Sequence, residues 1–158
     1  MEIYLDNSAT TKPYQEVVDK MVLALTTQYG NPSSIHKKGI EVEREIKEIR
    51  RNIARSLGAK ENEIYFTSGG TECNNTIIRS VARLNKKTKN HIISTVIEHP
   101  SVLDTLKDLE SEGFEVTYLP VDKDGKISIE DLKNAIKKET ILVSIMHVNN
   151  EIGISLTP

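Results

Sequence analysis

The spacing of apolar residues in the first sixty positions predicts two amphipathic helices. In two stretches, apolar residues recur every three or four positions, which is the period of a helix that buries one face. The first stripe comprises Val17, Val18, Met21, Val22 and Leu25, and the second comprises Val42, Ile46, Ile49, Ile53 and Leu57. Pro13 suits the start of the first helix, and Gly30 and Gly58 suit the two helix ends. A short strand-like run over residues 3–5 precedes them.

From residue 64 onward the pattern alternates between the period of a strand and that of a helix. It predicts strands over 64–67, 91–97, 115–119 and 140–146, and helices over 71–84, 100–112 and 129–137. Such alternation is typical of an α/β fold in which helices flank a mainly parallel sheet. The run 140–146 is almost continuously apolar, so we expect that strand to be buried on both faces.

Two glycines stand where the first predicted strand meets its helix. Gly69 and Gly70 lack Cβ atoms, so backbone N–H groups can close on a ligand there, and the helix start adds unpaired donors. Thr71 can add a hydroxyl, and a phosphate group would fit such a cup. The alternative is that Ser68 or Thr71 simply caps the helix and the glycines make a tight turn. These residues alone leave both interpretations open.

Polar loops follow two more of the predicted strands. Glu98 and His99 come after the strand over 91–97, and the run 147–153 follows the last strand. Ligands of an open parallel sheet lie outside the carboxyl ends of its strands, so we expect these loops to converge with the glycine cup. The structural alternative for His99 is a place at the helix start that Pro100 marks. Together the three loops favour an acidic or aromatic phosphate ligand.

Composition and charge exclude several classes of protein. The 158 residues carry 21 Lys and Arg against 23 Asp and Glu, a formal net charge of -2, so nothing indicates a nucleic-acid partner. The single cysteine cannot form an internal disulfide, and no signal pattern or membrane-length apolar run is present, so we expect a cytoplasmic protein without membrane association. The run 122–125 resembles the start of a calcium loop but lacks the later ligands, so we expect a turn and no metal site.

Four motifs occur along the chain in a definite order. They are residues 4–11 (YLDNSATT), residues 30–34 (GNPSS) with His36, residues 66–72 (FTSGGTE), and the pair Glu98-His99 with residues 147–153 (HVNNEIG). In order and spacing they resemble the motifs of the pyridoxal-phosphate-dependent cysteine desulfurases of the NifS/IscS type, within the class V aminotransferase group. The resemblance covers essentially the whole chain. It implies the N-terminal portion of the large domain of a fold-type I transferase that depends on pyridoxal phosphate.

The resemblance also implies roles for particular residues. Gly70 and Thr71 would bind the phosphate of pyridoxal 5'-phosphate, and His99 would stack on the cofactor ring and do acid–base work. Asn150 would hydrogen-bond the phenolic oxygen of the cofactor and help orient the substrate carboxylate. Asn7 would lie near the substrate. The implied reaction converts L-cysteine to L-alanine and leaves sulfur as an enzyme persulfide, for iron-sulfur clusters or for thiolation.

Several catalytic residues of that family have no match in these 158 residues. The Schiff-base lysine, the aspartate that pairs with the pyridine nitrogen, the substrate-binding arginine and the nucleophilic cysteine all lie beyond the position of Pro158. We therefore expect this chain alone to be inactive. Cys73 is the only thiol, but it stands where the family usually carries a small residue, so we expect it to pack rather than react. Lys37 imitates the family's His-Lys pair, and we expect it at the surface.

The resemblance implies an organisation and a set of partners as well. Residues 1–12 would pack on the small domain of full-length relatives, and residues 13–158 would form the N-terminal part of the cofactor-binding large domain. We expect L-cysteine as substrate, a homo-oligomer, a dimer in the family, and an iron-sulfur scaffold or another sulfur acceptor as partner. An uncovered sheet edge would also favour oligomerisation or marginal stability. The alternatives are a non-catalytic truncated module or fragment, and a related class V enzyme such as selenocysteine lyase.

Overall fold

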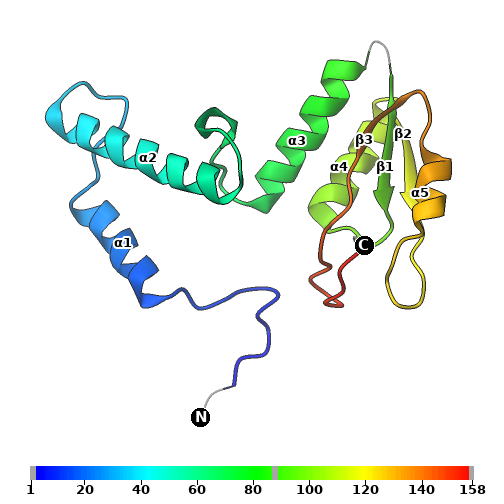
Figure 1. The fold of residues 1–158 in the computed structure, drawn as a ribbon, viewed down its shortest axis with the longest axis horizontal. Helices are drawn as coiled ribbons and strands as arrows, with labels where there is room; N and C mark the ends of the chain where they lie inside the picture. The colour runs from blue at the N-terminus through cyan, green and yellow to red at the C-terminus, as the bar shows by residue number, and fades with distance from the viewer. Residues whose placement is uncertain (1–2, 87–88, 157–158) are drawn as a thin grey trace. The chain divides into compact units, whose positions relative to one another are not determined.

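The computed structural model describes residues 3–86 and 89–156 of the chain. The chain divides into two compact units, residues 1–66 and 67–158. The first unit is helical and the second combines helices with a sheet (Figure 1), as the change of period near residue 64 predicts. Within the described ranges, no helix is both long enough and apolar enough to cross a membrane.

The first unit contains the two predicted amphipathic helices. They are α1 (Gln15–Thr26) and α2 (Lys37–Ser56), and a short 3-10 helix, η1 (Glu61–Glu63), follows. His36 caps α2, because its Nδ1 accepts the N–H of Gly39 over 3.4 Å. Gly58 follows the end of α2 with a φ of 64°, a left-handed conformation that favours glycine. No residue of α1 is buried, and most of its apolar stripe is exposed, namely Val17, Met21, Val22 and Leu25.

The predicted strands over 3–5 and 64–67 are wrong. Neither segment pairs with a strand among the described residues, and both lie outside regular secondary structure. The side chain of Arg50 contacts residues 64–66 instead: it donates a hydrogen bond to Ile64 O, and its guanidinium lies 4.7 Å from the centre of the Phe66 ring. Apolar content gives a segment the propensity to form a strand, but the strand forms only where a ladder partner is available.

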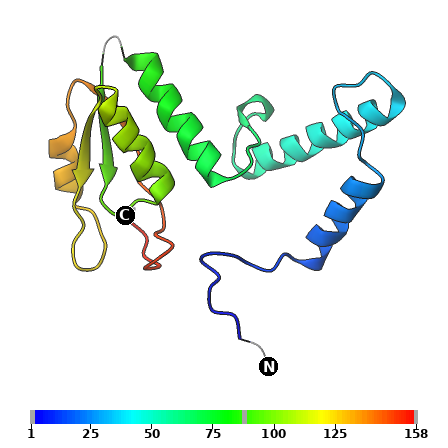
Figure 2. The same ribbon diagram turned by 180° about the vertical axis from the view of Figure 1, so that it is seen from behind.

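The second unit is built on a three-stranded parallel sheet in the order β2-β1-β3. Its strands are β1 (His91–Thr95), β2 (Glu115–Leu119) and β3 (Thr140–Val143), and its helices are α3 (Gly70–Asn85), α4 (Pro100–Ser111) and α5 (Ile129–Ala135). The chain passes from β1 to β2 through α4, and then back across β1 to β3 through α5. Because parallel crossovers are right-handed, this reversal places α4 and α5 on opposite faces of the sheet (Figures 1 and 2).

Packing of α3 and α4 against one face of the sheet forms the hydrophobic core. Ile92 of the central strand is fully buried in it. The other buried members are Ile78 and Ala82 of α3, Val102, Leu106 and Leu109 of α4, and Phe114. Burial of a large apolar side chain contributes about 1.5–3 kcal/mol. This core therefore sets where the N-termini of α3 and α4, which carry predicted site residues, can lie.

Burial among the strands differs from the expectation for residues 140–146. All five residues of β1 are buried, whereas β3 is only partly buried and ends at Val143, whose side chain is exposed. A register shift between His91 and Ile92 also interrupts the ladder between β1 and β3. A central strand has a neighbour on each side, while β3 has one among the described residues. Position in the sheet therefore decides burial more strongly than apolar content does.

Residues 122–125 form a turn, as expected. Asp122 Oδ1 accepts the backbone N–H groups of Asp124 and Lys126, each over 2.9 Å. Gly125 has a φ of 74°, which a residue with a side chain rarely adopts. The carboxylate of Asp122 thus satisfies the backbone of its own turn.

A buried histidine links the three strands on the sheet face opposite Ile92. The side chain of His91 is fully buried, with Nδ1 2.7 Å from Thr140 Oγ1 in β3 and Nε2 2.9 Å from Thr117 Oγ1 in β2. Burial is the largest cause of a lowered pKa for His91, and the positive charge of Lys137 adds to it. Two nearby carboxylates oppose the shift without reversing it. The native sheet therefore favours the neutral imidazole.

Acidification is expected to destabilise the folded sheet, because it favours protonation of His91. Its folded-state pKa lies below the unfolded value of about 6.5, so the unfolded chain binds more protons in the intervening range. The free energy of unfolding therefore decreases as the pH falls below the unfolded pKa of about 6.5. Amide hydrogen exchange at Ile92 and Ile93, corrected for intrinsic rates, should accelerate between about pH 7.5 and pH 5.5.

The variant His91→Gln tests the assignment, because it removes the titrating group. It should show a smaller pH dependence of exchange than the wild-type chain, whereas His147→Gln, at an exposed position, should retain the wild-type dependence. Equal pH dependence in the wild-type chain and in His91→Gln would contradict the prediction.

Candidate functional site

The start of α3 presents backbone donors at the glycine cup. Gly69 is the N-cap residue, and no side chain caps this helix end. Ser68 instead donates its N–H and its hydroxyl to Glu72 Oε2, over 2.7 and 2.6 Å, and these two bonds, the hydroxyl first, lower the pKa of Glu72. A Cβ built at Gly69 or Gly70 would meet no atom within 4 Å. Of the two interpretations, capping by Ser68 or Thr71 is therefore not observed, and the N–H groups of Gly70 and Thr71 are open to a ligand.

Thr71 and His99 line one shallow hollow between α3 and α4. Its volume is about 320 Å³. Its lining also includes Asn75 and Arg79 of α3, and Ser101, Asp104 and Asp108 of α4. Both Thr71 and His99 are exposed. The structure thus brings together Thr71 of the glycine cup and the histidine that follows β1, as convergence at the carboxyl edge of the sheet predicts.

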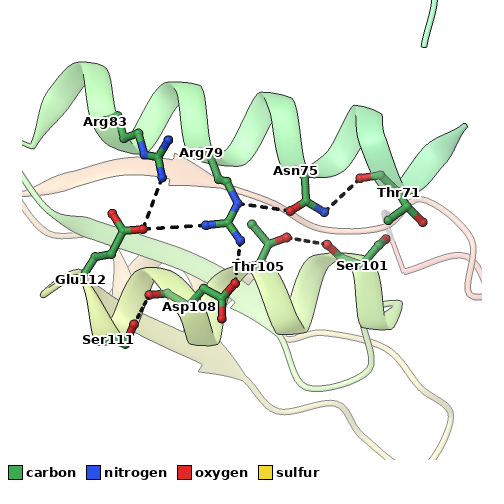
Figure 3. A network of polar contacts seen from close by, with 9 residues as sticks. All are labelled: Thr71, Asn75, Arg79, Arg83, Ser101, Thr105, Asp108, Ser111 and Glu112. Atoms are coloured by element: carbon green, nitrogen blue, oxygen red, sulfur yellow. Dashed lines mark hydrogen bonds and ion pairs between the residues drawn. The ribbon is translucent and has the colours of Figure 1, made fainter. Parts of the chain in front are cut away.

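The guanidinium of Arg79 in the hollow is paired with carboxylates (Figure 3). Arg79 Nη2 lies 2.6 Å from Asp108 Oδ2, and Arg79 Nη1 lies 3.8 Å from Glu112 Oε1. Arg79 Nε also donates to Asn75 Oδ1, and Asn75 Nδ2 donates to Thr71 O. Because the guanidinium of Arg79 is paired, recognition of an anion here would rest on the Thr71 hydroxyl and the backbone donors of α3.

Two buried side chains tie the loops after β1 and β3 together. Glu98 Oε1 accepts the hydroxyl of Thr95 over 2.9 Å and the N–H of Met146 over 2.8 Å. Asn149 Nδ2 donates to Ile97 O over 2.9 Å, and Asn149 Oδ1 accepts two N–H groups of the following turn over 2.8 and 3.1 Å. Glu98 is 6% exposed and Asn149 is 5% exposed. The predicted convergence of these two loops is confirmed.

Asn150 and Asn7 are not part of this hollow as the structure describes it. Asn150 is exposed, and its Nδ2 donates to Glu151 Oε1 over 3.0 Å. Asn7 belongs to the first unit, where its Nδ2 donates to Tyr4 O over 3.2 Å. The cofactor and substrate contacts expected of these two residues stay predictions.

Two residues, Cys73 and Lys37, could be mistaken for catalytic groups. Cys73 lies in the first turn of α3, where it is a free, half-buried thiol whose N–H donates to Gly69 O. The Lys37 side chain is 91% exposed at the start of α2, which confirms the expected surface position.

Sequence reasoning missed the side chains that hold the site in place. Asn149 anchors its loop, yet the sequence offers no signal that separates it from Asn150, since burial alone distinguishes two adjacent asparagines. Ser101 and Asn74 were also missed: Asn74 Nδ2 donates to Ser101 Oγ over 2.9 Å, and Ser101 Oγ lies 2.8 Å from His99 Nδ1. The helix start at Pro100 was a usable signal, because a residue just before such a proline often caps the helix.

The chain is similar to known proteins over nearly its whole length. The class-V aminotransferase family matches residues 3–158, and this chain belongs to it. It is 49% identical over 152 residues to the cysteine desulfurase IscS of Clostridium botulinum and 53% identical over 151 residues to that of Methanosarcina thermophila. It is 54% identical over 153 residues to the mitochondrial cysteine desulfurase of Candida albicans.

The chain covers only part of the relatives it resembles. Each match spans 96% of this chain but 38%, 37% and 31% of the three relatives, in the order given. Among solved structures, a NifS-like protein superposes with a TM-score of 0.96 at 42% identity, over 98% of this chain and 43% of that one. The structure of SspA in complex with cysteine gives 0.86 at 40% identity, over 91% and 42%. These likenesses confirm the predicted α/β fold and the resemblance to cysteine desulfurases.

Replacement of Asn149 by alanine is expected to destabilise the second unit. It would leave Ile97 O and the N–H groups of Glu151 and Ile152 without their partner, which costs about 1–3 kcal/mol. The matched variant Asn150→Ala removes an exposed amide and should change the free energy of unfolding by no more than about 0.5 kcal/mol. Urea unfolding of both variants measures the difference, and an equal loss in the two would overturn the assignment of Asn149 as the anchor.

Proposed function

We propose that this chain forms the N-terminal part of a cysteine desulfurase that depends on pyridoxal 5'-phosphate. The observation that carries the proposal is the shared hollow of Thr71 and His99, beside an uncapped helix start that follows two glycines. Relatives named cysteine desulfurase, at 49 to 54% identity, support the assignment of the activity.

The donor groups of the hollow fit the phosphate and ring of that cofactor. Unpaired N–H groups at Gly70 and Thr71, together with the helix dipole, favour a phosphate dianion, and the Thr71 hydroxyl adds a further donor. The imidazole of His99 is exposed in the same hollow, so its face is available to a flat ring. The volume of about 320 Å³ lies at the lower end of the range for small-molecule sites.

The residues of this chain would bind and orient the cofactor and hold a proton beside it. When bound, pyridoxal phosphate supplies an electron sink for bonds at the substrate α-carbon. Gly70 and Thr71 would hold the phosphate, and His99 would hold a proton at Nε2, the ring nitrogen that does not contact Ser101. Asn150 would orient the cofactor oxygen and the substrate carboxylate, with Asn7 near the substrate.

The overall reaction balances with one enzyme thiol as acceptor. The C–S bond of L-cysteine breaks, an S–S bond forms on the acceptor thiol, and a proton takes the place of sulfur on the substrate carbon, which gives L-alanine and a persulfide. The family's Schiff-base lysine and nucleophilic cysteine have no counterpart among residues 1–158. We therefore propose that the reaction requires a polypeptide segment that supplies both groups.

The substrate, the partners and the location of the protein are also proposals. We propose L-cysteine as the substrate, and the similarity of this chain to SspA, whose solved structure is a complex with cysteine, supports that choice. A homodimer, a cytoplasmic location, and a sulfur acceptor such as an iron-sulfur scaffold follow from the resemblance alone.

The decisive experiment supplies pyridoxal phosphate and L-cysteine to the intact protein that carries this chain. Formation of L-alanine together with a protein persulfide supports the proposal, and borohydride trapping locates the lysine that binds the cofactor. A selenocysteine-specific reaction would favour a selenocysteine lyase instead. Absence of any trapped lysine and of any turnover would favour a non-catalytic module.

Thr71→Val is expected to weaken binding of pyridoxal phosphate about tenfold, because one hydrogen bond to a charged group contributes about 1.5 kcal/mol. Thr76→Val makes the same change at another exposed position of α3 and should bind the cofactor as the wild-type chain does. Titration followed by cofactor absorbance measures both affinities. Equal affinities of the two variants would remove Thr71 from the phosphate site.

A further inference from the structure

The N-terminal turn of α4 determines which nitrogen of His99 carries a proton. The backbone N–H of Ser101 donates to His99 Nδ1 over 3.1 Å. A backbone amide can only donate, so Nδ1 must hold its lone pair toward Ser101. In the neutral imidazole the proton is therefore on Nε2. No other described residue hydrogen-bonds to that nitrogen, and the ring lines the hollow that also contains Thr71.

The hydroxyl of Ser101 reinforces the same arrangement. Its Oγ lies 2.8 Å from His99 Nδ1. Because Nδ1 carries no proton, the hydroxyl is the donor in this contact. Ser101 Oγ is then free to accept a hydrogen bond, and Asn74 Nδ2 donates to it over 2.9 Å. The backbone N–H and the hydroxyl of Ser101 therefore both donate to His99 Nδ1, and the preference for one tautomer depends on both contacts.

Helix capping alone does not account for this series. A capping side chain needs only to accept from the first-turn N–H groups, which His99 does through the backbone of Ser101. The hydroxyl of Ser101 and the amide of Asn74 add nothing to that cap. Ser101 is 9% exposed and Asn74 is half-buried on α3, so the series joins the two helices at a largely buried position. Ser101 lines the hollow beside the imidazole, whereas Asn74 is not among its lining residues and acts through Ser101.

We propose that Ser101 and Asn74 are positioning residues that hold His99 in its neutral Nε2–H tautomer, so that the imidazole meets a ligand in the hollow as a hydrogen-bond donor. A role as base at Nε2 requires the opposite tautomer, in which Nδ1–H would face the N–H of Ser101. The inference rests on the proposed function for the identity of the ligand, but the tautomer itself is a property of the protein without cofactor.

The test uses ¹⁵N signals of the histidine rings in the intact protein, without pyridoxal phosphate, at about pH 8, where an ordinary histidine is neutral. The signals of His99 are assigned by their loss in His99→Gln. We expect a wide separation between a protonated Nε2 and an unprotonated, hydrogen-bonded Nδ1, as a single tautomer gives. Averaged signals of a tautomeric mixture, or a protonated Nδ1, in the wild-type protein would overturn the proposal.

Variants separate the positioning role from a purely structural one. Ser101→Ala should narrow the chemical-shift separation between the two His99 signals. Ser101→Thr keeps the hydroxyl, so it should show the wild-type separation. Asn74→Asp should also narrow it, because a carboxylate would draw the Ser101 hydroxyl away from Nδ1. Ser111→Ala is the matched control, since it removes an exposed hydroxyl from the same helix. Unchanged signals in Ser101→Ala would overturn the proposal whether or not that variant loses stability.

Turnover of the protein loaded with cofactor gives the second readout. Ser101→Ala should lower kcat about tenfold with little change in KM, because misorientation of the Nε2–H donor removes part of its contribution. Ser101→Thr and Ser111→Ala should retain kcat, and a Ser101→Thr variant as slow as Ser101→Ala would contradict the role of the hydroxyl. If the ring signals behave as expected but the protein binds no pyridoxal phosphate, the positioning series stands and the proposed function fails.

Discussion

Parallel pairing of β1 with a strand on each side is the constraint on which the rest of the second unit depends. Since β2 and β3 both run parallel to β1, the carboxyl ends of all three strands lie along one edge of the sheet. The helices that cover the sheet return in the opposite direction, so α4 begins at that edge and α3 begins beside it. The hollow lined by Thr71 and His99 is the local result of this arrangement.

Buried polar groups hold the loops at that edge of the sheet in one geometry. The edge of a sheet only brings loops near one another, and loops without internal anchors keep their freedom. Glu98 and Asn149 remove that freedom by accepting and donating hydrogen bonds between the loop after β1 and the loop after β3. A buried carboxylate and a buried amide are costly without partners, so these contacts favour one loop arrangement strongly over its alternatives. Thr71 and His99, which line the hollow, are exposed, while Glu98 and Asn149 are buried.

In the second unit, the apolar pattern of the sequence predicted the helices more accurately than the pairing of the strands. The alternating period predicted helices over 71–84 and 100–112, and the structure has α3 and α4 within two residues of those bounds. The glycine cup and the place of His99 after β1 were also predictable, because glycine and proline act through local backbone chemistry. Strand pairing was less predictable: residues 64–67 have strand-like composition without a ladder, and β1 is more buried than residues 140–146.

The sequence by itself determined the class of fold, the order of its elements and the residues that stand at each strand end, since period, helix starts and turns are set by neighbours in the chain. Tertiary structure decided which strand became central, which of Asn149 and Asn150 was buried, and which hydrogen bonds surround His99. These outcomes depend on groups far apart in sequence, such as Asn74 with Ser101 and Glu98 with Met146. Their distances exist only after β1 and its covering helices have packed, so no local pattern could have contained them.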